Sequence, residues 1–254
     1  MPAMNRISSL AALLCITALA GCEENAVQDI TGPMPSARVK FHNFSMGAPG
    51  VNFYSGDTKL TAIGSATGTE STNGTAYGSA AAGGFYTAIA PGQHTLAGRI
   101  AAATDKDLVV SSAAATIEDG KFYTFYMSGP YNAGTKQADA FVVEDPIPAQ
   151  VDYAMAQVRF VNASANSNPM TLYVTPNAGG AETAIGGAVA YKAAGAFTAI
   201  PEGVYNLSAR SDVHTATRAS VSFAGGRVYT IALRGDMTVA TGTNAPFLDN
   251  TANR

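Results

Sequence analysis

The chain has 254 residues and a net charge of −3 at pH 7, and charged residues make up only 13% of it. The lack of a basic excess excludes a nucleic-acid-binding protein of the usual cationic kind. The low charge, with recurrent short runs of Val, Ile, Leu, Phe and Tyr, excludes a disordered polyelectrolyte, and the length leaves room for two domains of ordinary size.

An export signal is predicted at the N-terminus. Arg6 precedes an apolar run that is shorter than the roughly 20 residues of a membrane-spanning helix, and the run ends in Leu19-Ala20-Gly21-Cys22. These four residues resemble the bacterial lipobox, which implies cleavage before Cys22 and attachment of diacylglycerol to its sulfur. We therefore expect a signal peptide at 1–21 and a stable membrane anchor without a spanning helix.

Cys22 would be the only cysteine of the mature chain, because Cys15 lies inside the predicted signal peptide. No intramolecular disulfide can then form, and an exported protein without disulfides depends on the size of its core. Residues 22–36, which contain two prolines, are predicted to form a lipidated tether.

The rest of the chain repeats itself. The stretch "ARVKFHNFS" at 37–45 is followed by "AQVRFVNAS" at 156–164. Two further blocks align in the same order, 86–99 with 197–210 and 120–129 with 226–235, while the stretches between the blocks are shorter in the second copy. Insertions belong in loops, so the aligned blocks are predicted to be the strands.

Within the blocks, apolar residues alternate with polar ones, and Gly or Pro-Gly separates the runs. This period of two predicts strands, and no stretch shows a helical stripe. The fold class expected is all-β, with two tandem immunoglobulin-like β-sandwiches of Greek-key type at 37–145 and 156–254. Pro146 and Pro148 stiffen the predicted linker, 146–155.

The middle block of the second copy, "PEGVYNL", places Tyr205 where a tyrosine corner is expected, with the hydroxyl tying a loop to the sandwich. The first copy reads "APGQHTL" and has His94 at that position. We therefore assign both Tyr205 and His94 a structural role at the corner.

Both copies resemble the bacterial "domain of unknown function 4397" family, whose members read roughly A-x-V-R-F-x-N-A-S at the start and P-x-G-x-Y-x-L in the middle. The second copy fits better, since the first departs at His42, Phe44 and His94. The resemblance implies tandem β-sandwiches on exported or anchored proteins, and it supplies neither an activity nor functional residues.

Signals for catalysis or metal binding are weak. His42, on the polar face of the first strand, His94 and His214 have no metal-ligand spacing, and the hydrolase-elbow, dinucleotide and P-loop patterns do not occur. Adjacent carboxylates are interpreted as turn and linker residues: Glu118, Asp119, Glu144 and Asp145. Four loop aspartates could bind calcium but lack the EF-hand order: Asp57, Asp105, Asp107 and Asp212. We predict no catalytic residue, no metal and no cofactor.

One difference between the copies suggests a binding face. In "KFYTFYMS" the residues Tyr123, Phe125 and Met127 take the core side, so Phe122 and Tyr126 point outward, where the second copy has the smaller Val228 and Ala232. Two aromatic rings on an outer sheet face would suit a sugar ring or a protein partner. The alternative is that the second copy or the loop from Leu60 to Gly84 covers them. Residues 64–84, rich in Gly, Ala, Ser and Thr, are interpreted as a mobile insertion.

The sequence thus predicts an exported, lipid-anchored protein of the bacterial cell envelope, at the outer membrane or cell surface, that is a non-catalytic binding or adhesion module. Its expected partners are the membrane, reached through Cys22, and a glycan or an envelope protein, with no nucleic acid. A purely architectural envelope component is the first alternative, and an enzyme acting on polysaccharide or peptidoglycan is the second.

Overall fold

The computed structural model describes residues 35–61, 72–150 and 152–253. The predicted signal peptide, Cys22 and most of the tether lie outside these ranges. The described residues form β-strands and one short 3₁₀ turn, with no α-helix among them, in agreement with the predicted all-β class. No helix in this part of the chain is long and apolar enough to cross a membrane.

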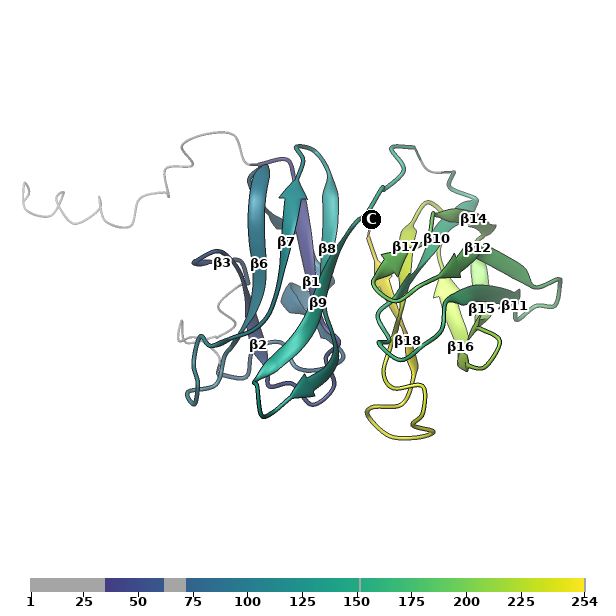
Figure 1. The fold of residues 1–254 in the computed structure, drawn as a ribbon. Helices are drawn as coiled ribbons and strands as arrows, with labels where there is room; N and C mark the ends of the chain where they lie inside the picture. Colours follow the sequence, from purple (N-terminus) through teal and green to yellow (C-terminus); the bar gives the residue numbers. More distant parts are fainter. Residues whose placement is uncertain (1–34, 62–71, 151, 254) are drawn as a thin grey trace, which may run out of the picture. The chain divides into compact units, whose positions relative to one another are not determined.

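The first copy folds into two facing sheets (Figure 1). One sheet has the order β3 (Thr58–Lys59), β2 (Val51–Ser55), β6 (Gly92–Ile100), β7 (Val109–Ile117). The other has the order β4 (Ser79–Ala80), β1 (Arg38–Asn43), β8 (Phe122–Asn132), β9 (Gln137–Glu144), and β5 (Thr87–Ala88) also pairs with β1.

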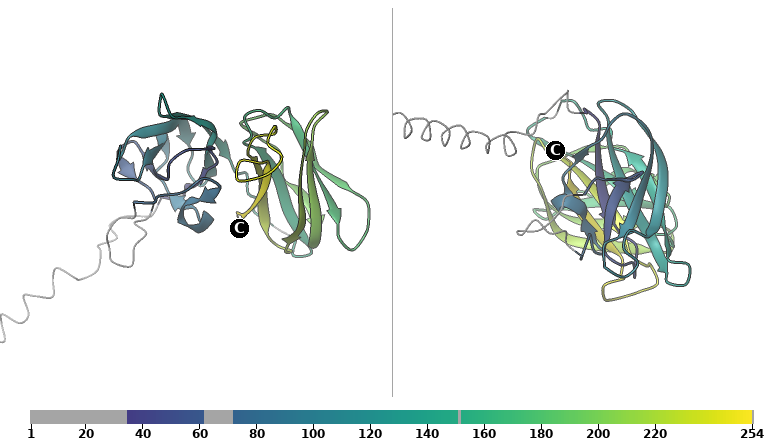
Figure 2. Two further views of the ribbon diagram at one scale, coloured as in Figure 1. Left: turned by 90° about the horizontal axis from the view of Figure 1, so that it is seen from below. Right: turned by 90° about the vertical axis from the view of Figure 1, so that its left-hand side faces the viewer.

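The second copy repeats this arrangement, as the green to yellow strands of Figures 1 and 2 show. One sheet has the order β12 (Thr183–Val189), β11 (Met170–Pro176), β15 (Gly203–Arg210), β16 (Thr215–Phe223). The other has the order β13 (Ala193–Ala194), β10 (Met155–Asn162), β17 (Val228–Arg234), β18 (Phe247–Ala252), and β14 (Thr198–Pro201) also pairs with β10.

In both copies the first strand runs parallel to the next-to-last one, β1 beside β8 and β10 beside β17, with the remaining pairings antiparallel. Corresponding residues share the same register, since Phe41 lies opposite Phe125 and Phe160 opposite Ile231. The sequence repeat is therefore a repeat of topology.

Each sandwich has its own apolar core, filled from both of its sheets. In the first, the rings of Phe41 and Phe53 stack with centroids 4.9 Å apart across the two sheets. The predicted inward residues Tyr123, Phe125 and Met127 all lie in this core, which confirms the alternation assigned to β8. Residues on the other side of each strand face outward from that core, as a period of two requires.

The repeated asparagines Asn43 and Asn162 explain the polar part of the repeated motif. Both are fully buried at the end of the first strand of their copy. The side-chain oxygen of each accepts a bond from the backbone N–H two residues later, at 3.2 Å and 3.1 Å, and the amide groups donate to the backbone carbonyls of Thr75 and Val189, respectively. The motif therefore ends the strand and holds the following loop.

The interpretation of 64–84 as a plain mobile insertion is wrong for its described part, residues 72–84. Thr75 bridges to Val51, Ser79–Ala80 form β4 against β1, and the 3₁₀ turn η1 (Ala81–Gly84) follows. The Gly- and Ala-rich stretch of the second copy likewise contains β12 and β13. Strands this short, or this poor in large apolar residues, lack the periodicity by which strands are predicted.

Candidate functional site

The outer faces of the β1-β8-β9 and β10-β17-β18 sheets pack against each other, and we call this contact the seam. Pro35–Arg254 accordingly form one compact unit. The apolar part of the seam consists of large rings from the first copy and smaller side chains from the second: Phe44, Tyr126, Phe141, Val161, Ala163 and Ala232.

Tyr126 lies in the middle of the seam with 1% of its surface exposed. Its ring stacks on those of His42 and Phe141, with centroids 5.1 Å away in each case. The hypothesis of an exposed aromatic platform at Phe122 and Tyr126 therefore fails for Tyr126, because the second copy covers it. Phe122 is half-buried and packs edge-on against Tyr86.

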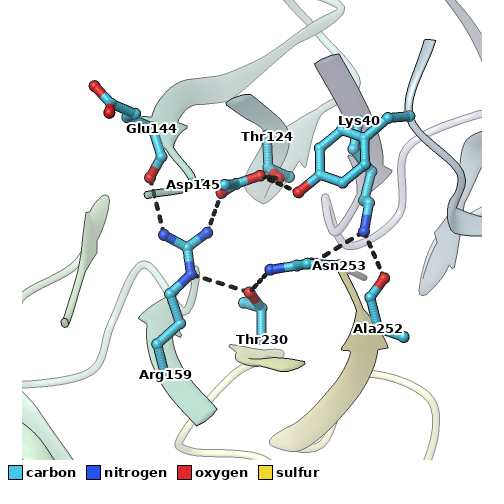
Figure 3. Close-up of polar contacts among 9 residues, drawn as sticks. Lys40, Thr124, Glu144, Asp145, Arg159, Thr230, Ala252 and Asn253 are labelled. Carbon is cyan, nitrogen blue, oxygen red and sulfur yellow. Dashed lines mark hydrogen bonds and ion pairs between the residues drawn. The ribbon is translucent and has the colours of Figure 1, made fainter. Parts of the chain in front are cut away.

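Asp145, predicted to be a linker residue, is instead buried at the centre of a polar network (Figure 3). One carboxylate oxygen accepts a bond from Arg159 of β10, and the other accepts bonds from the hydroxyls of Thr124 and Tyr86, each at 2.6 Å. Arg159 also donates to the carbonyl of Glu144 at 2.8 Å and to the hydroxyl of Thr230 at 3.0 Å. The network therefore joins the end of β9 to the second sandwich.

Lys40 enters the same network from β1, at the position that Arg159 occupies in the second copy. Its ammonium donates to the carbonyl of Ala252 at 2.9 Å and to the side chain of Asn253 at 3.1 Å. Burial lowers the pKa of Lys40 to about 8. The negative charge of Asp145 raises this pKa, and the positive charge of Arg159 lowers it further. A single carboxylate thus faces two buried cations.

His42 is also buried in the seam, although strand alternation had placed it on the polar face of the first strand. Its exposed fraction is 3%, and its ring contacts those of Phe44 and Tyr126, with centroids 4.9 Å and 5.1 Å away. Burial, and to a lesser degree the charge of Lys40, lower the pKa of His42 to about 3. The imidazole is therefore neutral at physiological pH.

Tyr205 and His94 make equivalent contacts in the two copies. The Tyr205 hydroxyl donates to the carbonyl of Pro201 at 2.7 Å, and the Nε2 atom of His94 lies 2.8 Å from the carbonyl of Ala90. Each partner is four residues upstream, so the imidazole makes the same contact with the preceding loop as the tyrosine hydroxyl does. The other ring nitrogen of His94 bonds to Ser55 at 2.7 Å.

A pocket of about 380 Å³, the seam pocket, opens between the two sandwiches. The first copy contributes His42, Phe44, Gly78, Ala80, Gly83, Gly84 and Phe85, and β18 contributes Asp249, Asn250, Thr251 and Ala252. A second pocket of about 260 Å³, the side pocket, shares Gly78 and is lined by Tyr77, Gly78, Arg234, Gly242, Thr243, Ala245, Pro246 and Phe247. The two pockets adjoin at Gly78, and we refer to them together as the groove.

Arg234 is the arginine that lines this groove, and it contacts a carboxylate and two aromatic rings there. Its guanidinium bonds to the carboxylate of Asp249 and lies over the rings of Phe247 and Tyr77, at 4.8 Å and 5.0 Å from their centroids. Burial raises the pKa of Asp249, and Arg234 opposes that change. Gly78 has a φ of +77°, and a Cβ there would lie 3.1 Å from the guanidinium, so this position favours glycine.

The sequence pattern of the family described as "Domain of unknown function (DUF4397)" matches residues 37–173 and 156–254. The chain belongs to the DUF4397 family. No curated protein sequence matches it.

Several solved structures resemble this DUF4397 protein weakly. The Bacillus anthracis TIE protein is 10% identical, with 78% of this chain covering 33% of that one at a TM-score of 0.22. A "putative cell adhesion protein" from Bacteroides ovatus is 11% identical, with coverages of 88% and 97% and a TM-score of 0.23. Another of that description, from Bacteroides fragilis, is 9% identical, with coverages of 85% and 98% and a TM-score of 0.24.

In this DUF4397 chain the loop aspartates do not converge. Each contacts a separate partner, as follows: Asp57 with Arg99, Asp105 with Lys136, Asp107 with Tyr54, and Asp212 with Asn168. Among the described residues, no group of three or more His, Cys, Asp or Glu side chains could hold a metal ion.

Sequence reasoning missed the residues that line the groove of this DUF4397 protein. Asp249 and Phe85 lie outside the aligned blocks, and Arg234 lies inside one without any signal that it lines a site. Strand alternation placed Lys40 and Arg159 on an outward face, with no sign that another sheet covers it. The one available signal was that both repeated motifs carry a cation at the same outward position, Lys40 in the first and Arg159 in the second.

Proposed function

We propose that this protein is a non-catalytic binding module of the bacterial cell envelope, held to a membrane by a lipid on Cys22. The observation that carries the proposal is the groove along the seam, where a neutral imidazole, a paired arginine and carboxylate, and the exposed ring of Phe85 line two adjoining pockets. Concave sites with a few oriented polar groups are typical of ligand binding.

The groove is poorly equipped for catalysis. A glycosidase generally needs two carboxyl groups about 5–9.5 Å apart. Among its described lining residues, the seam pocket has one carboxylate, Asp249, and that group is bonded to Arg234. This supports the binding interpretation over an enzyme acting on polysaccharide or peptidoglycan.

The seam supports binding because it fixes the two walls of the groove relative to each other. The β1 side and the β18 side come from different sandwiches, and buried contacts such as that between Arg159 and Asp145 join them. A site held in its binding geometry loses less conformational entropy on binding. In this proposal each sandwich is immunoglobulin-like, and the tandem acts as one body.

Lipid attachment is tested in cells by following labelled palmitate and membrane fractionation. Cys22→Ala is expected to lose both the label and membrane retention, whereas the matched control Cys15→Ala keeps both because that residue would leave with the signal peptide. Full labelling of Cys22→Ala would contradict the anchor.

Binding is tested with the full lipidated chain by protease accessibility on intact cells and by affinity capture of envelope components. Digestion on intact cells with capture of a saccharide or surface protein supports an adhesion role. Protection until the envelope is opened, with one stoichiometric protein complex captured, supports the architectural alternative. Capture of nothing in either compartment would contradict a binding module.

A further inference from the structure

His42 lines the seam pocket without a hydrogen-bond partner among the described residues. Its ring is 97% buried and neutral, so it carries one N–H donor and one acceptor nitrogen. Buried polar groups are satisfied with few exceptions. Because no protein group in the described ranges does so here, the imidazole of His42 is available to bond to a molecule in the pocket.

The second copy indicates that the fold itself does not require His42. Val161 occupies the equivalent position and is fully buried on the opposite side of the same seam. The same comparison places Ala196 at the position of Phe85, whose ring is 77% exposed beside the pocket. The polar ring and the exposed ring are thus particular to the copy that contributes the pocket wall.

The wall next to Phe85 consists largely of backbone. Gly78, Gly83 and Gly84 have φ values of +77°, +66° and +84°, which glycine adopts without strain. Across the pocket, the methyl group of Thr251 lies only 3.7 Å from where a Cβ of Gly84 would be. The pocket that these residues help to line has a volume of about 380 Å³, within the roughly 300–1,000 Å³ range of small-molecule sites.

The charges around the pocket are balanced. Asp249 is its only described carboxylate and is paired with Arg234, and His42 is neutral. Lys40, on the same strand as His42, is engaged by Ala252 and Asn253. Because the described lining residues offer no unpaired cation for a phosphate or a uronic acid, the pocket favours an uncharged ligand with several hydroxyl groups.

We infer that the seam pocket is a subsite for a neutral saccharide: the apolar face of a sugar ring packs on Phe85, and its hydroxyl groups bond to the imidazole of His42 and to the carboxylate of Asp249. Aromatic rings suit this task because they offer a flat apolar surface at low entropic cost. The inference rests on the proposed binding function and adds the ligand class and the residues.

The test uses the full lipidated chain in detergent on an array of neutral and acidic oligosaccharides, followed by calorimetric titration with a neutral oligosaccharide bound on the array. The variants His42→Val and Phe85→Ala carry the residues of the second copy, so the sandwich is expected to accept them. Each should weaken binding about ten-fold or more without lowering the melting temperature, by the loss of one central contact. Tyr153→Ala removes a ring that is 84% exposed and does not line the groove. This control variant should therefore bind the oligosaccharide as tightly as the wild-type protein does.

Undiminished saccharide binding by both variants, or a preference for acidic oligosaccharides, would overturn the inference while leaving a binding module intact. Absence of binding to every oligosaccharide on the array, together with capture of an envelope protein, would also overturn the inference and leave the binding module intact. An empty array with no captured component would contradict the proposed function as well.

Discussion

Lys40 shows how far a single side chain can depart from what its sequence position suggests. It alternates with core residues and so belongs to the polar face of β1, yet 1% of its surface is exposed. Alternation identifies the face of a strand, but it does not show whether another domain covers that face. The same limit applies to His42 and to Arg159, both of which the seam buries.

The depressed pKa of Lys40 predicts a specific pH dependence. Between about pH 8 and the ordinary pKa of 10.5, the unfolded chain binds more protons at this residue than the folded chain does, so stability increases with pH across that window. Relative to Lys40→Met, the wild-type protein should gain about 2 kcal/mol in unfolding free energy between pH 7 and pH 10.

Urea unfolding at both pH values measures this difference. Tyr86 and Tyr126, whose pKa values are raised by burial in the same seam, are present in both proteins, so their effects largely cancel. A difference between the two proteins that stays constant with pH would show that Lys40 titrates normally.

At the scale of elements, the aligned blocks coincide with three strands of each copy, which alternate over six or more residues: β1, β6 and β8 in the first and β10, β15 and β17 in the second. The long strands β7, β9, β11, β16 and β18 lie outside these blocks. Copy-to-copy differences were also informative, since His94 makes the same loop contact as Tyr205 although the two side chains share little chemistry. Short elements were missed: β4 has two residues and η1 four, so neither shows a period. Both line the groove, which is why the site could not be located from the sequence.

The corner contact should contribute a measurable share of the stability of the second sandwich. Tyr205→Phe removes the hydroxyl that bonds to Pro201 at 2.7 Å and is expected to lower the unfolding free energy by about 1 kcal/mol. Tyr153→Phe removes a hydroxyl from a ring that is 84% exposed and serves as the control, with no expected change. Equal unfolding midpoints for the two variants would mean that the corner bond is energetically neutral.

At the scale of the molecule, the seam combines two sandwiches that each have a complete core. The copies differ on their outer faces in a complementary way, since the large rings of Phe44, Tyr126 and Phe141 meet the smaller Val161, Ala163 and Ala232. The sequence displayed this asymmetry, but it is compatible both with an external ligand and with a covering domain. Only the arrangement of the two sheets shows that, for Tyr126, the second copy is the partner.

A seam of this kind predicts that the tandem unfolds as one cooperative unit. Ala232 is 2% exposed and faces the seam rather than the core of its own sandwich, so Ala232→Arg should separate the sandwiches while leaving both cores filled. Forcing an unpaired charge into this contact is expected to destabilise the joined state by on the order of 3–5 kcal/mol. Calorimetry should then resolve two transitions in place of one, and the linker at 146–155 should become sensitive to proteases.

Ala184→Arg, at an exposed position of β12, is the matched control and should keep the single transition. One transition in the Ala232 variant as well would mean that the sandwiches are coupled by something other than the seam, and the rigid groove on which ligand binding depends would then need a different origin.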